Sequence, residues 1–305
     1  MKPLLRYGDS GSYVTECQQL LTHQGYNIAV DGMFGSGTEK AVRSFQESKG
    51  LWSDGIVGQQ TWSALEDDRP SMGFDVCVDE YVPLNPGQYM SEVVGKIGVC
   101  IHHTVSDGDP NRIVNLWNTD SRGRVGTHFV IGRKMDNGNT DNDGKIIQCM
   151  DLETQWAYHV ATTRMGFSSS HNDNANKYYV GIEMCSWGCL DKRNGKYYIL
   201  GSDIEIDEEE VEVLDDPWRT YKYWHKYSLN QIHALKKLLQ ALHGQAGLNL
   251  EDRPYDPPVN WQWFNLDWEA MALRRKITIH SSFEYGKFDA YPSTEMAAML
   301  RSLYG

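Results

Sequence analysis

The sequence has 305 residues, with 29 Lys and Arg against 41 Asp and Glu, and a formal net charge of −12 at pH 7. This charge argues against a nucleic-acid partner, because an acidic surface repels phosphates. No apolar run approaches the roughly 18 residues that a membrane-spanning helix needs, so we expect no membrane insertion. The length exceeds that of one ordinary domain and predicts a small domain and a larger one.

A short internal repeat lies near the N-terminus. Residues 31–38 read Asp-Gly-Met-Phe-Gly-Ser-Gly-Thr, and residues 54–61 read Asp-Gly-Ile-Val-Gly-Gln-Gln-Thr. Each copy ends in a threonine near an expected helix start, and an apolar helix with Val14 and Leu21 precedes the first copy. These features predict a compact all-α domain of three helices.

Residues 4–66 resemble the three-helix type of peptidoglycan-binding module. The resemblance rests on the two Asp-Gly-x-x-Gly turns, on Gly25-Tyr26 and on Ala-Val-Arg-Ser-Phe-Gln at residues 41–46. It implies that this domain binds peptidoglycan, whereas the plainer alternative is a helical appendage with a structural role. The aromatic candidates for ligand contact can equally belong to the core. The candidate contacts are Asp31, Phe34, Trp52 and Trp62.

The rest of the chain predicts a second domain. We expect a first domain at residues 1–68, a linker at 69–91 and a second domain at 92–305. In the second domain, patterns typical of strands and helices alternate, which predicts an α/β fold with a mixed central sheet flanked by helices. Strands are expected near residues 97–103, 127–133, 145–150, 178–185 and 276–281, and helices near 110–119, 229–246, 266–274 and 293–303.

Residues 186–227 form a longer connection than the short loop expected after a strand. The pair Asn194-Gly195 lies between β-prone runs and is a strong hairpin signal. Much of the chain's acidity lies in residues 203–216. We therefore interpret the segment as an insertion made of a hairpin and a solvated acidic flap.

Two of the expected strands end in histidine. Residues 98–104 read Gly-Val-Cys-Ile-His-His-Thr, which includes His102, and a similar apolar run ends at His280, nine residues before Asp289. Either histidine alone is more often a hydrogen-bonded, half-buried residue. Together, two strand-end imidazoles and a carboxylate form a three-ligand set that leaves one position open, as catalytic zinc sites do.

Two charged residues suit a metal-assisted hydrolysis. Glu183 is the one acid in a β-rich run, an environment that raises a carboxyl pKa and favours proton transfer from an attacking water. Lys287, two residues before Asp289, is placed to stabilise an oxyanion. Taken singly, Glu183 is more often a strand-edge carboxylate with a salt-bridge partner, and Lys287 is more often a solvated loop lysine.

From about residue 92 onward, the sequence resembles the zinc-dependent N-acetylmuramoyl-L-alanine amidases, a family that includes phage lysozyme-amidases and the peptidoglycan recognition proteins. The resemblance implies that His102, His280 and Asp289 bind Zn²⁺. It also implies that Glu183 acts as the base and that Lys287 stabilises the transition state. The segments that carry the resemblance are residues 101–104, 126–131, 156–159, 180–183 and 280–289.

The same resemblance concerns the substrate cleft. It implies that His159 lines the cleft, with Trp156 close to it. Thr127 stands where some members of the family carry a catalytic tyrosine, so Glu183 must carry the proton transfer. The family's Asp-Pro-Gly after the last ligand is replaced here by Asp-Ala-Tyr-Pro at residues 289–292, which leaves the shape of this loop open.

The resemblance implies a monomeric zinc amidase that cuts between N-acetylmuramic acid and L-alanine in peptidoglycan. The first residues lack the apolar region of a signal peptide. With a wall-binding module, this points to a phage endolysin, made in the host cytoplasm and reaching the wall through a membrane pore. The alternatives are a non-catalytic peptidoglycan-recognition protein, a bacterial autolysin and a regulatory or structural role unconnected to the cell wall.

The six cysteines show no pairing pattern. In a chain without a recognisable secretion signal, we expect them to be reduced thiols. Cys185 and Cys189 could form a disulfide or part of a second metal site, but no further ligands lie close to them in the sequence.

Overall fold

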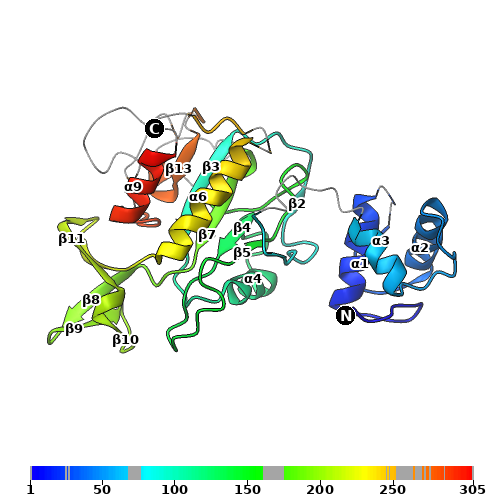
Figure 1. Ribbon diagram of the computed structural model, residues 1–305, viewed down its shortest axis with the longest axis horizontal. Coiled ribbons are helices and arrows are strands. Elements are labelled where there is room, and N and C mark those ends of the chain that lie inside the picture. The colour runs from blue at the N-terminus through cyan, green and yellow to red at the C-terminus, as the bar shows by residue number, and fades with distance from the viewer. Residues whose placement is uncertain are drawn as a thin grey trace. The chain divides into compact units, whose positions relative to one another are not determined.

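The structure, a computed structural model, divides into two compact units, Met1–Gly73 and Phe74–Gly305 (Figure 1). None of the helices among the described residues is long and apolar enough to span a membrane. The structure describes residues 2–24, 26, 28–67, 77–160, 175–244, 246, 248–251, 264, 270, 273–274, 276–284 and 286–303.

The first unit is built from three helices, as predicted: α1 (Ser12–His23), α2 (Ser36–Ser48) and α3 (Gln59–Asp67). Apolar residues spaced at helical intervals on each helix point inward and pack into one core. The predicted helix starts hold, because α2 and α3 each begin inside or next to a copy of the repeat. The core consists of Leu5, Val14, Cys17, Leu20, Leu21, Phe34, Ala41, Val42, Phe45, Val57, Trp62 and Leu65.

The repeat builds one hydrogen-bond network twice, each time around a buried glutamine. In the first copy, Gln18 Nε2 donates to Asp31 Oδ1 at 2.9 Å and to the Thr38 hydroxyl at 3.0 Å. Its Oε1 accepts from the backbone N–H of Gly32 at 2.9 Å. Gly32 has φ +71°, a conformation that glycine adopts without strain, so the turn requires glycine at this position.

In the second copy, Gln46 takes the part of Gln18. Its Nε2 donates to Asp54 Oδ1 at 2.9 Å and to the Thr61 hydroxyl at 3.1 Å, and its Oε1 accepts from Gly55 N–H at 2.9 Å. The Asp-Gly and Thr positions recur in the sequence because each copy must satisfy the polar atoms of one buried glutamine.

Replacing Gln46 tests this network. Gln46→Ala leaves the buried Gly55 N–H and other polar partners without a hydrogen bond, which costs on the order of 2 kcal/mol. Amide hydrogen exchange in α1–α3 of the full chain should therefore speed up. The control is Gln60→Ala, which truncates an exposed glutamine of α3. Equal exchange in the two variants would contradict the role given to Gln46.

The second unit has a six-stranded mixed sheet in the order β1-β5-β4-β7-β3-β13. β4 and β5 run antiparallel, whereas the other neighbours run parallel. The α/β prediction is thus confirmed, and each predicted strand is present in a slightly shorter form. The bounds are β1 (Glu80–Tyr81), β3 (Gly98–His103), β4 (Phe129–Ile131), β5 (Ile146–Gln148), β7 (Tyr179–Met184) and β13 (Ile277–Ile279).

Helices cover this sheet. α6 (Leu229–Gly244) packs against β4 and against α9 (Thr294–Ser302), and α4 (Pro110–Thr119) also contacts β4. Buried Gln231 of α6 donates to the backbone oxygens of Ile131 and Cys185, which fastens the helix to the ends of two strands. These three helices were predicted within two residues of their bounds. Most of the helix predicted at 266–274 lies outside the described residues.

Two smaller sheets complete this unit. β2 (Met90–Ser91) pairs with β6 (Gln155–Trp156). The segment predicted as an insertion forms a five-stranded antiparallel sheet in the order β10-β9-β8-β12-β11, named here the inserted sheet. Its strands are β8 (Cys189–Arg193), β9 (Lys196–Ile199), β10 (Glu205–Ile206), β11 (Val211–Trp218) and β12 (Tyr221–His225).

The predicted hairpin is present, and most acidic side chains of the next stretch are exposed as expected, but this stretch forms part of the sheet and not a separate flap. Asn194 and Gly195 have φ values of 51° and 81° and join β8 to β9, as the Asn-Gly signal indicates. Residues 203–216 instead contribute to β10, a short 3-10 helix (Glu208–Glu210) and β11. Val211 and Leu214 are both buried despite the acids around them, and their burial helps to hold β11 in the sheet.

The six cysteines are buried free thiols. Cys185 and Cys189 therefore form no disulfide with each other.

Candidate metal centre and cavity

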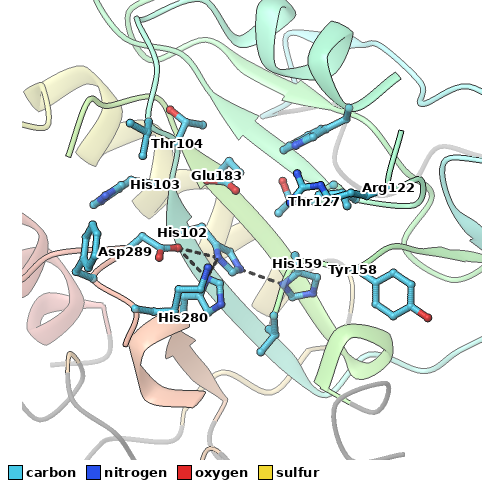
Figure 2. Close-up of a pocket in the computed structure, with 17 residues that line it drawn as sticks. His102, His103, Thr104, Arg122, Thr127, Tyr158, His159, Glu183, His280 and Asp289 are labelled. Carbon is cyan, nitrogen blue, oxygen red and sulfur yellow. Dashed lines mark hydrogen bonds and ion pairs between the residues drawn. The ribbon is translucent and has the colours of Figure 1, made fainter. Parts of the chain in front are cut away.

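Three side chains meet at one edge of the six-stranded sheet (Figure 2). β3 and β13 are parallel neighbours, so His102 near the end of β3 and His280 directly after β13 lie side by side. Their Nδ1 atoms are 3.2 Å apart. Oδ2 of Asp289 lies 3.2 Å from Nδ1 of His102 and 2.9 Å from Nδ1 of His280. The structure thus brings together the three predicted ligands.

This triangle of atoms fits a small divalent cation. A tetrahedral zinc ion with bonds of about 2.0–2.1 Å holds its ligand atoms roughly 3.3 Å apart. Burial lowers the pKa of His102 to about 4, which keeps the imidazole neutral as metal binding requires. Burial alone would raise the pKa of Asp289, but His280 and the close contacts with both imidazoles hold it well below its usual value. The site therefore offers two imidazole nitrogens and one anionic oxygen.

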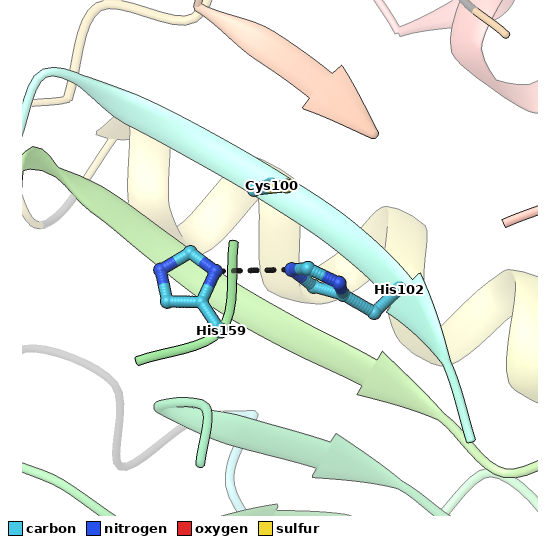
Figure 3. A group of neighbouring side chains, drawn as sticks. All are labelled: Cys100, His102 and His159. Atoms are coloured by element: carbon cyan, nitrogen blue, oxygen red, sulfur yellow. Dashed lines mark hydrogen bonds between the residues drawn. The ribbon is translucent and has the colours of Figure 1, made fainter. Parts of the chain in front are cut away.

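A second group of possible ligands shares His102 (Figure 3). Nε2 of His102 lies 3.0 Å from Nδ1 of His159, and Cys100 lies on β3 two residues before His102. Burial raises the pKa of the Cys100 thiol well above its usual range, and a protonated thiol is a poor ligand. We therefore interpret the contact as a hydrogen bond that His102 Nε2–H donates. That tautomer leaves Nδ1 of His102 free to bind a metal.

Glu183 lies on β7, directly across from His102 in the register of the two strands. Burial, followed by the nearby charge of Asp289, raises the pKa of Glu183 well above its usual range, and Lys287 opposes this shift. Oε2 of Glu183 is buried and finds no hydrogen-bond partner among the described residues. A carboxylate in this condition is available to a ligand or a water in the cavity.

A cavity of about 480 Å³ opens over the centre. Its walls include the three candidate ligands, Glu183, Lys287, and the predicted cleft residues Thr127 and His159. Trp156 does not line it. That side chain is buried in β6, with its ring 5.8 Å from that of Tyr158, which does line the cavity.

Several other residues of the cavity were not predicted. Trp117, Arg122 and Phe288 line it together with Tyr158. Tyr158 belongs to a segment that carries the family resemblance, so the sequence held a signal for it. The sequence held no signal for Arg122 or Trp117, because these residues lie in the turn after α4 and near the end of α4, and only the fold brings them to the cavity.

The candidate contacts of the first unit occupy different environments. Phe34 and Trp62 are only 1% and 3% exposed and belong to the core, which corrects their prediction as ligand contacts. Asp31 accepts hydrogen bonds from Gln18 and from the Met33 N–H, so its carboxylate shapes the turn. Trp52, at 85% exposure, is the predicted contact whose ring is open to a ligand.

Comparison with known families agrees with this arrangement. Residues 97–283, more than half of the chain, match the family model described as N-acetylmuramoyl-L-alanine amidase. The chain belongs to this amidase family. Residues 10–65 match the model described as a putative peptidoglycan binding domain.

Individual relatives match small parts of this chain. A segment of 81 residues is 38% identical to N-acetylmuramoyl-L-alanine amidase CwlM of Mycobacterium tuberculosis, covering 23% of this chain and 20% of that protein. A segment of 63 residues is 46% identical to a spore cortex-lytic enzyme of Bacillus cereus, covering 20% of this chain and 24% of that protein. The chain thus spans only a fifth to a quarter of the length of these curated relatives.

Two solved structures are also similar to parts of the chain. A Burkholderia AP3 phage endolysin is 42% identical over 22% of this chain and 26% of that chain, with a TM-score of 0.22. PlyL is 12% identical over 74% of this chain and 96% of that chain, with a TM-score of 0.39.

The metal centre is testable by direct titration. Equilibrium dialysis with Zn²⁺ as the probe should give about one bound ion per chain, and His280→Ala should weaken binding at least tenfold because it removes a ligand. His233→Ala, which truncates an exposed histidine of α6, is the matched control. Unchanged binding in His280→Ala would exclude His280 as a ligand.

Proposed function

We propose that the chain hydrolyses the amide bond between N-acetylmuramic acid and L-alanine in peptidoglycan, with a zinc ion held by His102, His280 and Asp289. The observation that carries this proposal is that the two imidazole nitrogens and the carboxylate oxygen converge beside Glu183 in a single cavity. The match of residues 97–283 to the amidase family supports the choice of bond.

When bound, Zn²⁺ supplies a Lewis acid that polarises the scissile carbonyl and makes water a better nucleophile. Glu183 is the proton acceptor in this proposal. Its raised pKa and the unpartnered Oε2 suit it to take a proton from the attacking water and to pass that proton to the leaving amine. Lys287 lines the same cavity and supplies positive charge to the oxyanion that develops.

Thr127 and His159 have narrower roles. The Thr127 hydroxyl donates to the backbone oxygen of Phe129 at 2.9 Å, so its proton is engaged and proton transfer rests on Glu183. Nδ1 of His159 accepts from His102, which places the proton of the neutral His159 ring on Nε2. That Nε2 is buried without a partner among the described residues and can donate to the substrate.

This proposal competes with a recognition protein of the same fold that binds peptidoglycan without cutting it. The intact His–His–Asp set and the unpartnered Glu183 favour the enzyme, because a binding protein needs neither. A zymogram on purified cell wall, run with and without chelator, separates the two.

The roles of Glu183 and Lys287 can be tested by substitution. Glu183→Gln keeps the shape and removes the base, so turnover should fall roughly 100-fold or more. The turnover of Lys287→Ala should fall by a similar factor, because a charge at an oxyanion contributes about 3 kcal/mol. Zinc content should remain at the wild-type value in both variants. Stoichiometric loss of zinc in either one would make that residue a ligand and not a catalytic group.

We further propose that the first unit holds the enzyme on the insoluble wall, as its match to a peptidoglycan-binding family suggests. Tethering raises the effective concentration at the polymer without changing the metal centre. Residues 74–305 alone should therefore cleave a small soluble muramoyl-peptide at the rate of the full chain and lyse intact wall several times more slowly. Equal losses on both substrates would show that the first unit belongs to the catalytic fold.

For the biological setting, we propose a phage endolysin that is made in the host cytoplasm and reaches the wall through a membrane pore. A phage endolysin is among the similar structures, and a bacterial autolysin or cortex-lytic enzyme is the alternative. Expression in a bacterial host should cause lysis only when a pore-forming protein is produced with it. Lysis without the pore would favour the autolysin.

A further inference from the structure

We infer that the inserted sheet positions Asp289, the third candidate metal ligand, and that Glu212 of β11 is the main positioning residue. The inference rests on the proposed zinc centre and concerns side chains outside it. The segment that requires positioning is residues 286–293, named here the Asp289 loop, which joins α8 (His280–Phe283) to α9 without helix or strand.

Few backbone hydrogen bonds hold the Asp289 loop. Among the described residues, the backbone of Asp289 accepts from Ser281 N–H at 3.3 Å, Lys287 N–H donates to Glu284 at 3.2 Å, and Ser293 N–H donates to Tyr291 at 2.8 Å. None of these bonds fixes the direction of the Asp289 carboxylate. Apart from its contacts with His102 and His280, the carboxylate is oriented by the side chains that pack on either side of Asp289.

The inserted sheet contacts the loop on both sides of Asp289. Before Asp289, the ring of Phe288 lies 5.5 Å from that of Tyr221 on β12. After it, the Tyr291 ring stacks on Trp224 at 4.8 Å and 13°. It also stacks on Tyr227 at 4.7 Å and 23°. Tyr291 and Trp224 are fully buried, so these stacks restrict the loop tightly.

Glu212 adds directional contacts to these stacks. The Tyr291 hydroxyl donates to Glu212 Oε2 at 2.8 Å, and the backbone N–H of Thr294 donates to Glu212 Oε1 at 2.8 Å. Glu212 is directly opposite Trp224 across β11 and β12, so both reach Tyr291 from one face of the inserted sheet. Its carboxylate also lies at the N-terminus of α9, where a negative charge is stabilised. Figure 1 shows β11 in the region of α9.

The same cluster reaches the other side of the metal centre. The hydroxyl of Tyr227 lies 2.9 Å from Nδ1 of His103, the neighbour of His102 on β3. On β12 itself, the ring of Trp224 lies 6.3 Å from that of His103. The inserted sheet thus contacts residues adjacent to two of the three candidate ligands. These contacts give the insertion a positioning role at the candidate metal centre, which its sequence alone did not suggest.

The decisive measurement is the zinc affinity of full-length variants, obtained by competition with a chelator. Glu212→Ala should bind zinc roughly 10- to 100-fold more weakly, as removal of an outer partner of a ligand typically does. With Co²⁺ in place of Zn²⁺, its visible absorption spectrum should also change, because the Asp289 oxygen moves. Asp215→Asn, an exposed position of the same strand, should leave both readouts unchanged.

Tyr291→Phe is the second variant, because it keeps both ring stacks and removes only the hydroxyl that Glu212 accepts from. It should weaken zinc binding in the same direction, and the double variant should be no weaker than Glu212→Ala alone, since both act through one hydrogen bond. The inference is overturned if both single variants keep the wild-type zinc affinity and Co²⁺ spectrum while the metal-free protein unfolds at a lower temperature. That result would mean a purely structural role.

These outcomes are separable from the fate of the proposed function. If the wild-type chain binds zinc but leaves peptidoglycan uncut, the proposed function falls and the affinity comparison still decides the role of Glu212. If the wild-type chain binds no zinc, the proposed zinc centre and this inference fall together.

Discussion

Two imidazole nitrogens, one from His102 and one from His280, and a carboxylate oxygen of Asp289 lie within 3.2 Å of one another at the edge of a buried sheet. Nitrogen lone pairs this close repel each other unless a cation or a proton lies between them. Burial disfavours the proton, as the pKa of about 4 for His102 indicates. A cation held between these atoms would relieve this repulsion, and the rest of the second unit is arranged so that the three candidate ligands meet.

The parallel pairing of β3, β7 and β13 meets this constraint. Adjacent parallel strands deliver their last residues to one edge, so β3 and β13 bring the two histidines together and β7 places Glu183 beside His102. The hydrogen bond from His102 to His159 selects the tautomer that leaves Nδ1 free. Asp289 comes from a loop, which is why its position depends on packing against other parts of the unit.

The strand-end histidines could be predicted from sequence because an apolar run that ends in a polar residue is visible without the fold. The three-helix core of the first unit was predictable for a similar reason, since its repeat satisfies the same polar atoms twice. The burial of Phe34 and Trp62 could not be predicted, because an aromatic residue in a small domain can face the core or a ligand with the same sequence pattern. Their burial decides between the two.

The packing of the inserted sheet was beyond prediction. Its hairpin follows from Asn194-Gly195, but the acidic stretch that includes Glu212 carries no sign of the buried Tyr291 that it contacts. Local charge suggested a solvated flap, and most of these acids are indeed exposed, but Glu212 is buried by its tertiary contacts. Arg122 likewise reaches the cavity only because α4 ends beside it.

The most direct test of the account is to identify the bond that the chain cuts. Purified peptidoglycan digested by the zinc-loaded protein should release peptides with a new free amino group on L-alanine, detected by mass spectrometry after amine labelling. Chelator should abolish this product and added Zn²⁺ should restore it. Products cut within the glycan or between other stem residues, or the same yield of free L-alanine amine in the presence of chelator, would contradict the account.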